Sequence, residues 1–232
     1  MIKKILLLFF LCGLSCTSDD IIRSEKTSFY KIYKDIVASK PATNPSEKPT
    51  EKKVYDRAWL SKYNQPIIFL SSLDGKNTAS LVALGNYKDI LTWVSADGIS
   101  VSFLNGILIA TRGYSQDLME SQQNGIGTLF TGNTKTRLKK YRYLNGENEY
   151  KELTFSCTII EKTNTPSVFL GLTLETTRFT EVCQSRTNKH TNEYYVLSGT
   201  NIVLKSKQWI SETNGYVIFH NYYAFQDNPI KK

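Results

Sequence analysis

The run DILTWVSADGISVSFLNGILIATRGYSQDL, residues 89–118, follows Lys88 and contains three apolar segments separated by two tight-turn signals. Asp97-Gly98 and Asn105-Gly106 place residues that tolerate positive φ where a short hairpin needs them. The segments are rich in Ile, Val, Phe, Trp and Thr, which suit the pleated surface of a sheet. They are residues 90–94, 99–104 and 107–111. The pattern predicts a three-stranded antiparallel meander and contains no catalytic signature.

Short apolar runs bounded by turn residues continue on both sides of this meander, as is typical of barrels and sandwiches. The further strand candidates are residues 66–71, 80–84, 150–161, 168–174 and 177–184, with a turn at 85–87 and a helical turn within 114–123. The chain has 232 residues, of which 41% are hydrophobic and 12% aromatic, so it can bury a sizeable core. We therefore expect an all-β fold, an antiparallel barrel or half-barrel built from meanders, in a single domain over residues 54–232.

The preceding region, residues 16–53, predicts a helix and a linker. Apolar residues recur at helical spacing at Ile22, Phe29, Ile32, Tyr33, Ile36 and Val37, and Pro41 ends the pattern. Residues 40–53, KPATNPSEKPTEKK, have little to bury and form a Pro- and Lys-rich connector. The helix is amphipathic, and because its polar face is mixed in charge, packing on the barrel is favoured over lying on a membrane.

The N-terminus has the organisation of a lipoprotein leader. Lys3 and Lys4 form a basic start, residues 5–11 form an apolar core too short to span a bilayer, and Ser15 precedes Cys16. We expect a signal peptide over residues 1–15 and lipidation of Cys16; an ordinary signal peptide ending near Ser15 is the alternative. Thr17, in place of Asp, favours the outer membrane, where the lipid would anchor a protein that faces the periplasm.

The formal net charge is +8, from 29 Lys and Arg against 21 Asp and Glu. Removal of Lys3 and Lys4 with the leader leaves 27 against 21, or +6. This charge could favour an anionic polymer or surface, although a lysine-rich composition is the simpler explanation. The densest basic run, KTRLKKYR at residues 135–142, is expected to be a solvated strand or loop face. The alternative is a contact for an acidic sugar polymer or a phosphate headgroup.

With Cys16 lipidated, Cys157 and Cys183 are an even pair in an oxidising compartment, so a disulfide between them is expected. The bond requires Cα atoms within about 7 Å, whereas next-but-one strands lie about 10 Å apart. The two strands must therefore be adjacent, or the sheet must curl enough to bring them together. His190, in a polar turn, and His220, in a strand, supply no ligand spacing, so neither a metal nor a cofactor is predicted.

No motif of a serine hydrolase, zinc protease or dinucleotide-binding enzyme is present, and no residue is assigned a catalytic role. A glycosidase would need two carboxylates about 5–10 Å apart. The carboxylates available for such a pair are Asp97, Asp117, Glu120, Glu175 and Glu181. Their spacing defines no pair, and Asp97 already has a structural role in its turn. Trp93 and Trp209 could stack on sugar rings, but such residues more often belong to a core.

Several short motifs follow one another in a specific order. They are Trp93-x-Ser95-x-Asp97-Gly98, Asn105-Gly106, Thr111-Arg112-Gly113, Asp117-Leu118, Glu181-Val182-Cys183, Asn192-x-Tyr194-Tyr195 and Ser206-x-Gln208-Trp209. Together they resemble the YjbF/GfcB family of lipoproteins, which is linked to group 4 capsule and exopolysaccharide production. The likeness covers most of the mature chain, and the family fold is similar to an antiparallel barrel or half-barrel with a helix alongside.

The resemblance implies a non-enzymatic accessory in the assembly or export of an extracellular polysaccharide. Its partners would be proteins of that export pathway and an anionic polysaccharide, and no nucleic acid is expected. The residues expected at a surface for a glycan or a partner protein are Trp93, Asp97, Arg112, Lys139, Lys140, Arg142, Gln208 and Trp209. One alternative is a carrier whose dry apolar cavity holds an acyl chain or an undecaprenyl-type lipid. The other is a glycan-active enzyme with converging carboxylates in a cleft lined by aromatics.

Overall fold

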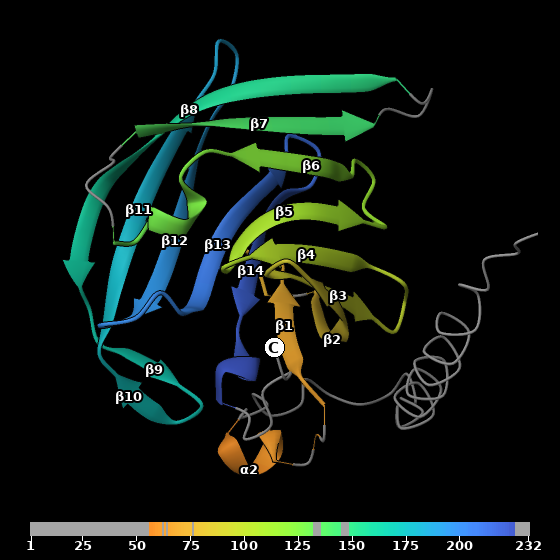
Figure 1. Ribbon diagram of the computed structural model, residues 1–232. Coiled ribbons are helices and arrows are strands. Elements are labelled where there is room, and N and C mark those ends of the chain that lie inside the picture. The colour runs from red at the N-terminus through yellow and green to blue at the C-terminus, as the bar shows by residue number, and fades with distance from the viewer. Residues whose placement is uncertain are drawn as a thin grey trace, which may run out of the picture. The chain divides into compact units, whose positions relative to one another are not determined.

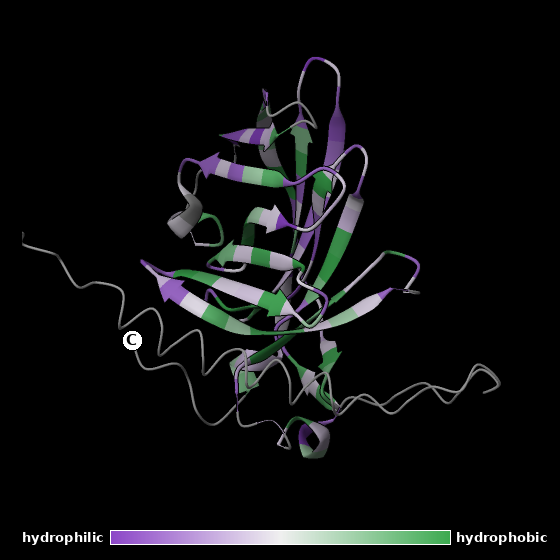
Figure 2. Cartoon of the chain, turned by 90° about the vertical axis from the view of Figure 1, so that its right-hand side faces the viewer, coloured by the Kyte–Doolittle hydropathy of each residue, from purple (hydrophilic) through white to green (hydrophobic). Residues whose placement is uncertain are grey.

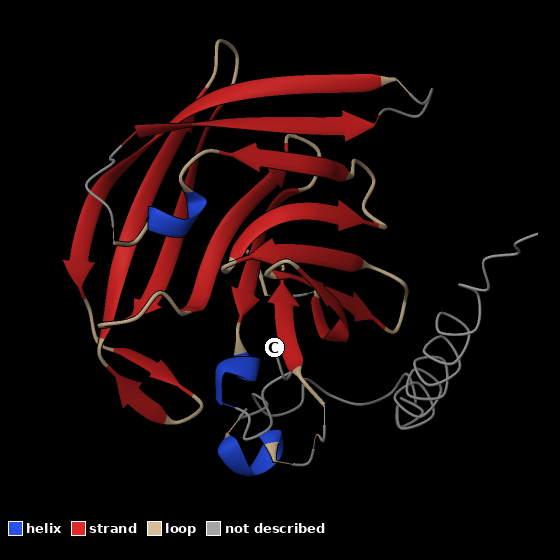
Figure 3. Ribbon diagram, viewed as in Figure 1, coloured by secondary structure: helices blue, strands red, loops and turns tan. Residues whose placement is uncertain are grey.

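The computed structural model describes residues 56–61, 63, 65–75, 77–131, 136–144 and 149–225, all of which belong to one compact unit, Asn44–Lys232. Their regular structure is almost entirely β, with one short α-helix and two 3-10 turns (Figure 3). The predicted leader, the predicted lipidation residue Cys16 and the predicted helix within residues 16–53 lie outside the described residues. Within the described part of the chain, no helix has the length and apolar character needed to cross a membrane.

A 12-stranded antiparallel sheet curls into a nearly closed barrel (Figure 1). Its strand order is β5-β4-β3-β2-β1-β14-β13-β12-β11-β8-β7-β6. The strands are β1 (Ile67–Ser71), β2 (Thr78–Tyr87), β3 (Ile90–Ser95), β4 (Ser100–Leu104), β5 (Ile107–Arg112), β6 (Leu118–Gln123), β7 (Thr136–Leu144), β8 (Tyr150–Asn164), β11 (Thr176–Gln184), β12 (Lys189–Leu197), β13 (Val203–Ser211) and β14 (Gly215–His220). The other elements are the separate hairpin of β9 (Ser167–Phe169) and β10 (Leu172–Leu174), and the helical segments α2 (Arg57–Leu60), η1 (Ile126–Thr128) and η2 (Tyr222–Phe225). This architecture confirms the predicted all-β antiparallel barrel.

The meander of β3, β4 and β5 confirms the two predicted hairpin turns. Strand β3 pairs with β4 in the register Trp93↔Val101, and β4 pairs with β5 in the register Val101↔Thr111. Gly98 and Gly106 adopt φ angles of 87° and 80°, in a region that residues with a Cβ avoid. Both turns therefore depend on glycine for their backbone conformation.

Two chain reversals lie elsewhere than the sequence predicts. Strand β2 continues through residues 85–87, and the chain turns at Lys88 and Asp89, whose φ angles are 47° and 67°. Residues 168–174, predicted as one strand, form the β9–β10 hairpin because Leu170 and Gly171 take φ angles of 52° and 76°. An apolar run by itself does not reveal such a reversal, since both arms of the hairpin share its composition.

Two other segments form structure that the sequence does not predict. Residues 57–60 form the short helix α2, whose first turn is capped by Asp56: its carboxylate accepts a hydrogen bond from the Trp59 amide at 2.7 Å. Residues 118–123, predicted within a helical turn, form β6 and pair with β7 in the register Ser121↔Tyr141. Pairing with β7 satisfies backbone groups that an isolated helical turn would leave unpaired. This pairing outweighs the polar composition of the segment, from which the helical turn is predicted.

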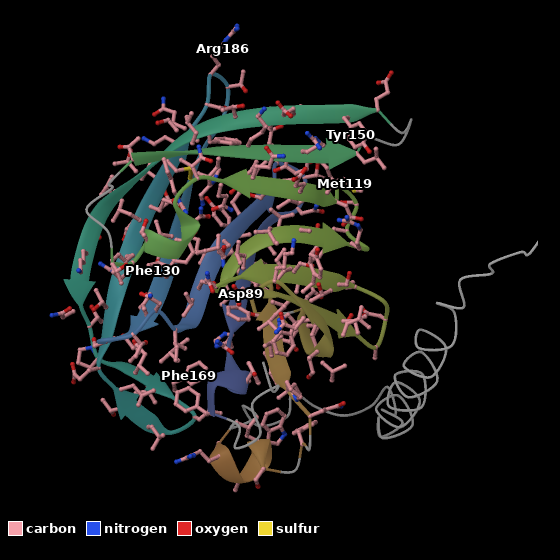
Figure 4. All side chains as sticks on the ribbon, viewed as in Figure 1. Asp89, Met119, Phe130, Tyr150, Phe169 and Arg186 are labelled. Atoms are coloured by element: carbon pink, nitrogen blue, oxygen red, sulfur yellow. A yellow bond between two sulfur atoms is a disulfide. The ribbon has the colours of Figure 1, made fainter. Side chains whose placement is uncertain are left out.

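The side chains alternate between the two faces of the strands, and Figure 2 shows bands of opposite hydropathy along them. On β12, for example, residues 190, 192, 194 and 196 are buried, whereas the residues between them are partly exposed. Large side chains fill the space that the sheet encloses (Figure 4). The largest that are fully buried include Trp93, Tyr143, Tyr194, Lys139 and Phe155. A one-residue slip would expose this set, so the filled interior fixes the register of the strands.

Side chains close the barrel where the sheet order ends, between β5 and β6. Arg112 donates hydrogen bonds from Nη1 to the Leu118 carbonyl at 3.1 Å and from Nη2 to the Met119 carbonyl at 3.3 Å. Thr111 Oγ1 accepts a hydrogen bond from the Leu118 amide at 2.9 Å and donates one to Asp117 at 3.0 Å. These contacts satisfy backbone groups that the missing β5–β6 ladder would otherwise pair.

A second apolar cluster lies at the end of the sheet that carries α2, η2 and the β9–β10 hairpin (Figure 1). Phe69 from β1, Phe169 from β9 and Tyr222 from η2 meet there. The ring centroid of Tyr222 lies 5.1 Å from those of both phenylalanines. The hairpin therefore leaves the main sheet but stays anchored to it by aromatic packing.

Candidate functional site

The structure confirms the predicted disulfide between Cys157 on β8 and Cys183 on β11. The two residues are directly opposite each other, with Cα atoms 3.9 Å apart. Because the β9–β10 hairpin leaves the main sheet, β8 and β11 are neighbours although 26 positions separate the cysteines. Both cysteines are fully buried, so the bond joins the two strands from inside the barrel.

A buried carboxylate, Glu181, lies on the same face of β11 as Cys183 and receives hydrogen bonds from β7 and β12. From β7, Arg137 donates to Oε1 from Nε and Nη2 at 2.9 and 2.7 Å, and Lys139 donates to Oε2 at 2.7 Å. From β12, Asn192 Nδ2 and the Tyr194 hydroxyl donate to Oε2 at 3.0 and 3.1 Å. We refer to Glu181, Arg137, Lys139, Asn192 and Tyr194 as the Glu181 cluster.

The alternation of β7 places the cations of this cluster inside the barrel. Every second residue from Arg137 to Tyr143 is buried, and the residues between them are at least partly exposed. The basic run at residues 135–142 is therefore divided between two faces. Lys140 and Arg142 point outward, where both pair with Glu152. The prediction of a solvated basic face is right for one half of the run and wrong for the other.

The electrostatics of the cluster keep its carboxylate ionised. Burial by itself raises the pKa of Glu181, but the charges of Lys139 and Arg137 outweigh it and lower the pKa to about 2. Burial lowers the pKa of Lys139 to about 8; Glu181 opposes this shift, and the charge of Arg137 adds to it. A carboxylate that is charged, fully paired and closed to solvent holds strands together and does not exchange protons with a substrate.

His190, predicted in a polar turn, is a buried residue of β12. Its ring stacks on Trp209 with centroids 4.3 Å apart and meets Phe155 edge-on at 4.8 Å. Burial lowers the pKa of His190 to about 4, and the charge of Lys139 acts in the same direction, so the imidazole is neutral near pH 7. His220 lies on β14 as predicted, and burial lowers its pKa to about 4 as well. Both histidines serve packing.

The cysteine sulfurs and a carboxylate oxygen of Glu181 lie within 4.8 Å of one another, which is close enough for shared metal ligation. The disulfide removes Cys157 and Cys183 from such a role, because metals bind thiolate sulfur. The oxygens of Glu181 are already used by the donors of its cluster. This group of residues therefore does not fit a metal.

Half of the residues expected at a glycan or partner surface face the barrel interior. Their exposed fractions are 2% for Trp93, 1% for Lys139, 3% for Gln208 and 7% for Trp209. Gln208 spans the interior: its amide oxygen accepts a hydrogen bond from the Leu108 amide, and its Nε2 donates to the Gly106 carbonyl, both at 2.8 Å. Side chains buried to this extent do not present a surface to a polymer, and these four belong to the core.

The other four residues lie on three different elements and have local partners. Asp97 occupies the β3–β4 turn, where the Ser95 hydroxyl donates to its carboxylate. Arg112 closes the seam between β5 and β6. Lys140 and Arg142 belong to the ion pairs on the outer face of β7. The eight expected residues are thus divided among the core, a turn, the seam and an outer ion-pair network, and the fold does not gather them into one site.

Two of the candidate glycosidase carboxylates, Asp97 and Asp117, lie near Tyr114 in the loop between β5 and β6. Burial raises the pKa of Tyr114 to about 12, and both carboxylates add to the shift. Asp117 uses both oxygens within its own turn, since Oδ1 accepts from the Tyr114 amide at 3.1 Å and Oδ2 accepts from the Gly113 amide at 3.0 Å. These contacts, with that of Ser95 to Asp97, account for both carboxylates as turn residues.

A pocket of about 300 Å³ lies beside the apolar cluster that contains Phe130, Phe179 and Val196. Its walls come from β8, β11, β12, the β12–β13 turn and the segment that follows η1, and Figure 4 labels Phe130 of that segment. The lining includes Phe130, Phe179, Lys162, Thr177 and Ser198. The sequence alone does not predict this pocket, because its residues come from distant segments. The one local signal in the sequence is the adjacent apolar pair Ile159-Ile160, which interrupts the alternation of β8.

The chain is similar to known proteins in sequence and in fold. The sequence profile of the family described as "Group 4 capsule polysaccharide lipoprotein gfcB, YjbF" matches residues 34–220. Among solved structures, the chain is similar to the crystal structure of the hypothetical lipoprotein YmcC from Escherichia coli (K12), with a TM-score of 0.59 and 16% sequence identity. The alignment covers 77% of this chain and 92% of that chain. At this identity the likeness is one of fold. No curated protein matches the chain.

Proposed function

Because the chain belongs to the YjbF family of group 4 capsule polysaccharide lipoproteins, we propose that it is a non-enzymatic accessory in the assembly or export of an extracellular polysaccharide. Cys16 carries its lipid anchor after removal of residues 1–15, and residues 16–53 connect that anchor to the β domain. The domain faces the periplasm from the outer membrane, and its partners are other proteins of the export pathway.

The observation that carries the non-enzymatic assignment is the structural role of the residues in the motifs that resemble the family. Asp97-Gly98 and Asn105-Gly106 form turns, and Thr111-Arg112 closes the barrel. In the second half of the chain, Glu181 and Cys183 lie buried in the interior. Residues of a catalytic site would have to reach substrate, whereas these determine the turns, closure and interior of the barrel.

The two rival functions have less support. A lipid carrier needs a dry apolar cavity, but the interior is filled by aromatic rings and by the charged Glu181 cluster. A glycosidase needs one carboxylic acid with a raised pKa, yet the pKa of Glu181 is lowered to about 2. Asp97 and Asp117 are each held by hydrogen bonds in their turns.

Lipidation is tested by growing cells with a labelled fatty acid and comparing the wild type with Cys16→Ala. The label should enter the wild type and the control variant Cys12→Ala, because Cys12 lies inside the predicted leader. It should not enter Cys16→Ala, which should also leave the outer-membrane fraction. Equal labelling of all three proteins would overturn the anchor and the localisation together.

The accessory role is tested by measuring surface polysaccharide. Deletion of the protein should lower the polymer output, whereas Asp97→Asn, Asp117→Asn, Glu120→Gln and Glu175→Gln should each retain it as long as the variant stays folded. A folded variant in which one amide abolishes output would refute the non-enzymatic assignment. Circular dichroism of each purified variant provides the folding control.

A further inference from the structure

We propose that the pocket lined by Phe130, Phe179 and Lys162 binds one acidic sugar unit, bearing a carboxylate or a phosphate. The inference rests on the proposed function for the source of this ligand, the exported polysaccharide. Its physical basis is independent of that source and lies in the charge, the aromatic lining and the polar rim of the pocket.

A β-bulge in β8 directs Lys162 into the pocket. The register between β8 and β11 shifts by one residue at Ile160. On one side of the bulge Cys157 faces the interior, and on the other side Lys162 does so, opposite Phe179. Without the extra residue, the strand alternation would place Glu161 inward and give this position the opposite charge.

Lys162 supplies an uncompensated positive charge. Its ammonium lies 5.4 Å from the centroid of the Phe179 ring, and it has no ion-pair partner among the described residues. Its neighbour Glu161 points outward and pairs with Arg178 at 2.6 Å. The other residues that line the pocket are uncharged. An anion is therefore the ligand that this charge favours.

Aromatic rings form one wall of the pocket. Phe130, which follows η1, lies 5.1 Å from Phe179 and 5.4 Å from Tyr194 between ring centroids. These contacts fix the orientation of Phe130 and leave it in the pocket lining together with Phe179. A pyranose ring has a face of C–H groups that packs on such aromatic surfaces.

A polar rim faces these rings. Thr131, Thr177, Ser198, Thr200 and Asn201 contribute hydroxyl groups and an amide to the lining. The hydroxyls of Thr177 and Ser198 lie 3.5 Å apart, and Gly199 turns the chain beside them with a φ angle of 77°. Hydroxyls and amides both donate and accept hydrogen bonds, which matches the hydroxyl groups around a sugar ring.

The size and lining of the pocket favour this ligand over a lipid chain. Its volume of about 300 Å³ is at the lower limit of small-molecule sites, which is suited to a single sugar unit. An acyl chain in the same place would bury the Lys162 ammonium against groups that accept no hydrogen bond, which is costly.

The test is a titration of the full-length lipoprotein in detergent micelles by ligand-observed NMR, with D-glucuronate, D-glucose 6-phosphate and D-glucose as probes. The wild type should bind the acidic sugars roughly ten-fold more tightly than glucose, the difference expected for one hydrogen bond to a charged group. Lys162→Gln should remove this preference. Lys205→Gln is the matched control, because its ammonium also lies over a ring, that of Tyr195 at 5.7 Å, but does not line the pocket.

Several results would overturn the proposal. They are equal binding of glucose and glucuronate, an unchanged preference in Lys162→Gln, and absence of binding at millimolar sugar. Displacement of glucuronate by glycerol monolaurate, an uncharged acyl chain, would also overturn it, because it would indicate a lipid site. Deletion of the protein distinguishes this failure from failure of the proposed function. If deletion lowers surface polysaccharide while the titration fails, only the pocket inference falls; if deletion has no effect, the proposed function falls whatever the titration gives.

Discussion

Gly106, in the turn between β4 and β5, is predicted to be the glycine of the meander that tolerates substitution least. The turn packs against β13 inside the barrel, and Gln208 of that strand donates a hydrogen bond to the Gly106 carbonyl at 2.8 Å. A Cβ at position 106 would lie 2.6 Å from the Cβ of Val203 and 2.7 Å from its Cγ2. With a φ angle of 80°, Gly106→Ala therefore perturbs the backbone and the packing at once.

The magnitude follows from these two contributions. Holding alanine at positive φ costs about 1–2 kcal/mol. Overpacking against a side chain of a filled core costs about 1–3 kcal/mol. If the turn moves away to relieve the contact, the hydrogen bonds of Gln208 to Gly106 and Leu108 weaken, at about 1 kcal/mol each. The expected loss is about 2–5 kcal/mol, a large share of the ~5–15 kcal/mol that stabilises a typical domain.

Gly98, in the neighbouring β3–β4 turn, provides the matched control. Its φ angle is 87°, close to that of Gly106, but a Cβ there would meet nothing within 4 Å. Gly98→Ala should therefore cost the backbone strain alone, about 1–2 kcal/mol. The difference between the two variants isolates the contact of the β4–β5 turn with β13.

The assay is chemical denaturation followed by tryptophan fluorescence, since Trp93 and Trp209 are buried and report on the interior. A thermal melt is the second readout, in which 1 kcal/mol corresponds to about 2–4 °C for a domain of this size. Equal losses in Gly106→Ala and Gly98→Ala would refute the contact with β13. Unchanged stability of both variants would refute the positive φ angles themselves.

Three further predictions concern the barrel interior. Glu181→Gln leaves two buried cations without their carboxylate and should cost about 3–5 kcal/mol in the same denaturation assay. Glu193 lies on the outer face of β12, 3.4 Å from Lys207, so the control Glu193→Gln should cost less than about 1 kcal/mol. Stability should fall as the pH drops from 6.5 to about 4, because the unfolded chain binds protons that His190 and His220 do not bind in the folded protein. It should fall again as the pH drops from 4.5 to about 2, because protonation of Glu181 removes the charge that its cluster stabilises. Melting temperatures across this range should show both decreases. Because Glu152 and Glu161 also have lowered pKa values, the second decrease should become smaller in Glu181→Gln without vanishing, and a decrease of unchanged size would contradict the assignment to Glu181. Replacing Cys157 and Cys183 together by alanine should cost roughly 3–4 kcal/mol, which is the chain-entropy value for a loop whose ends are 26 residues apart. A double variant as stable as the wild type would contradict a structural role for the bond.

The sequence by itself determined those features whose causes are local. Asp97-Gly98 and Asn105-Gly106 define their turns because few residues other than glycine adopt positive φ without strain. The alternating Ile, Val and Phe of residues 90–111 define the strands of the meander, because the strand period is two. The even number of cysteines left after Cys16 predicts the Cys157–Cys183 pair, and the motif order predicts the family.

The tertiary structure decided which face of each strand became the interior. The run KTRLKKYR is rich in basic residues, and its side chains in β7 alternate between the two faces of the strand. Only the presence of Glu181 on β11 and Asn192 on β12 makes Arg137 and Lys139 acceptable inside. The candidate pocket depends in the same way on the bulge at Ile160, which directs Lys162 rather than Glu161 inward. Burying a charge is favourable only when its partners are already in place, and here they come from strands that meet only when the sheet closes; no local pattern contains that information.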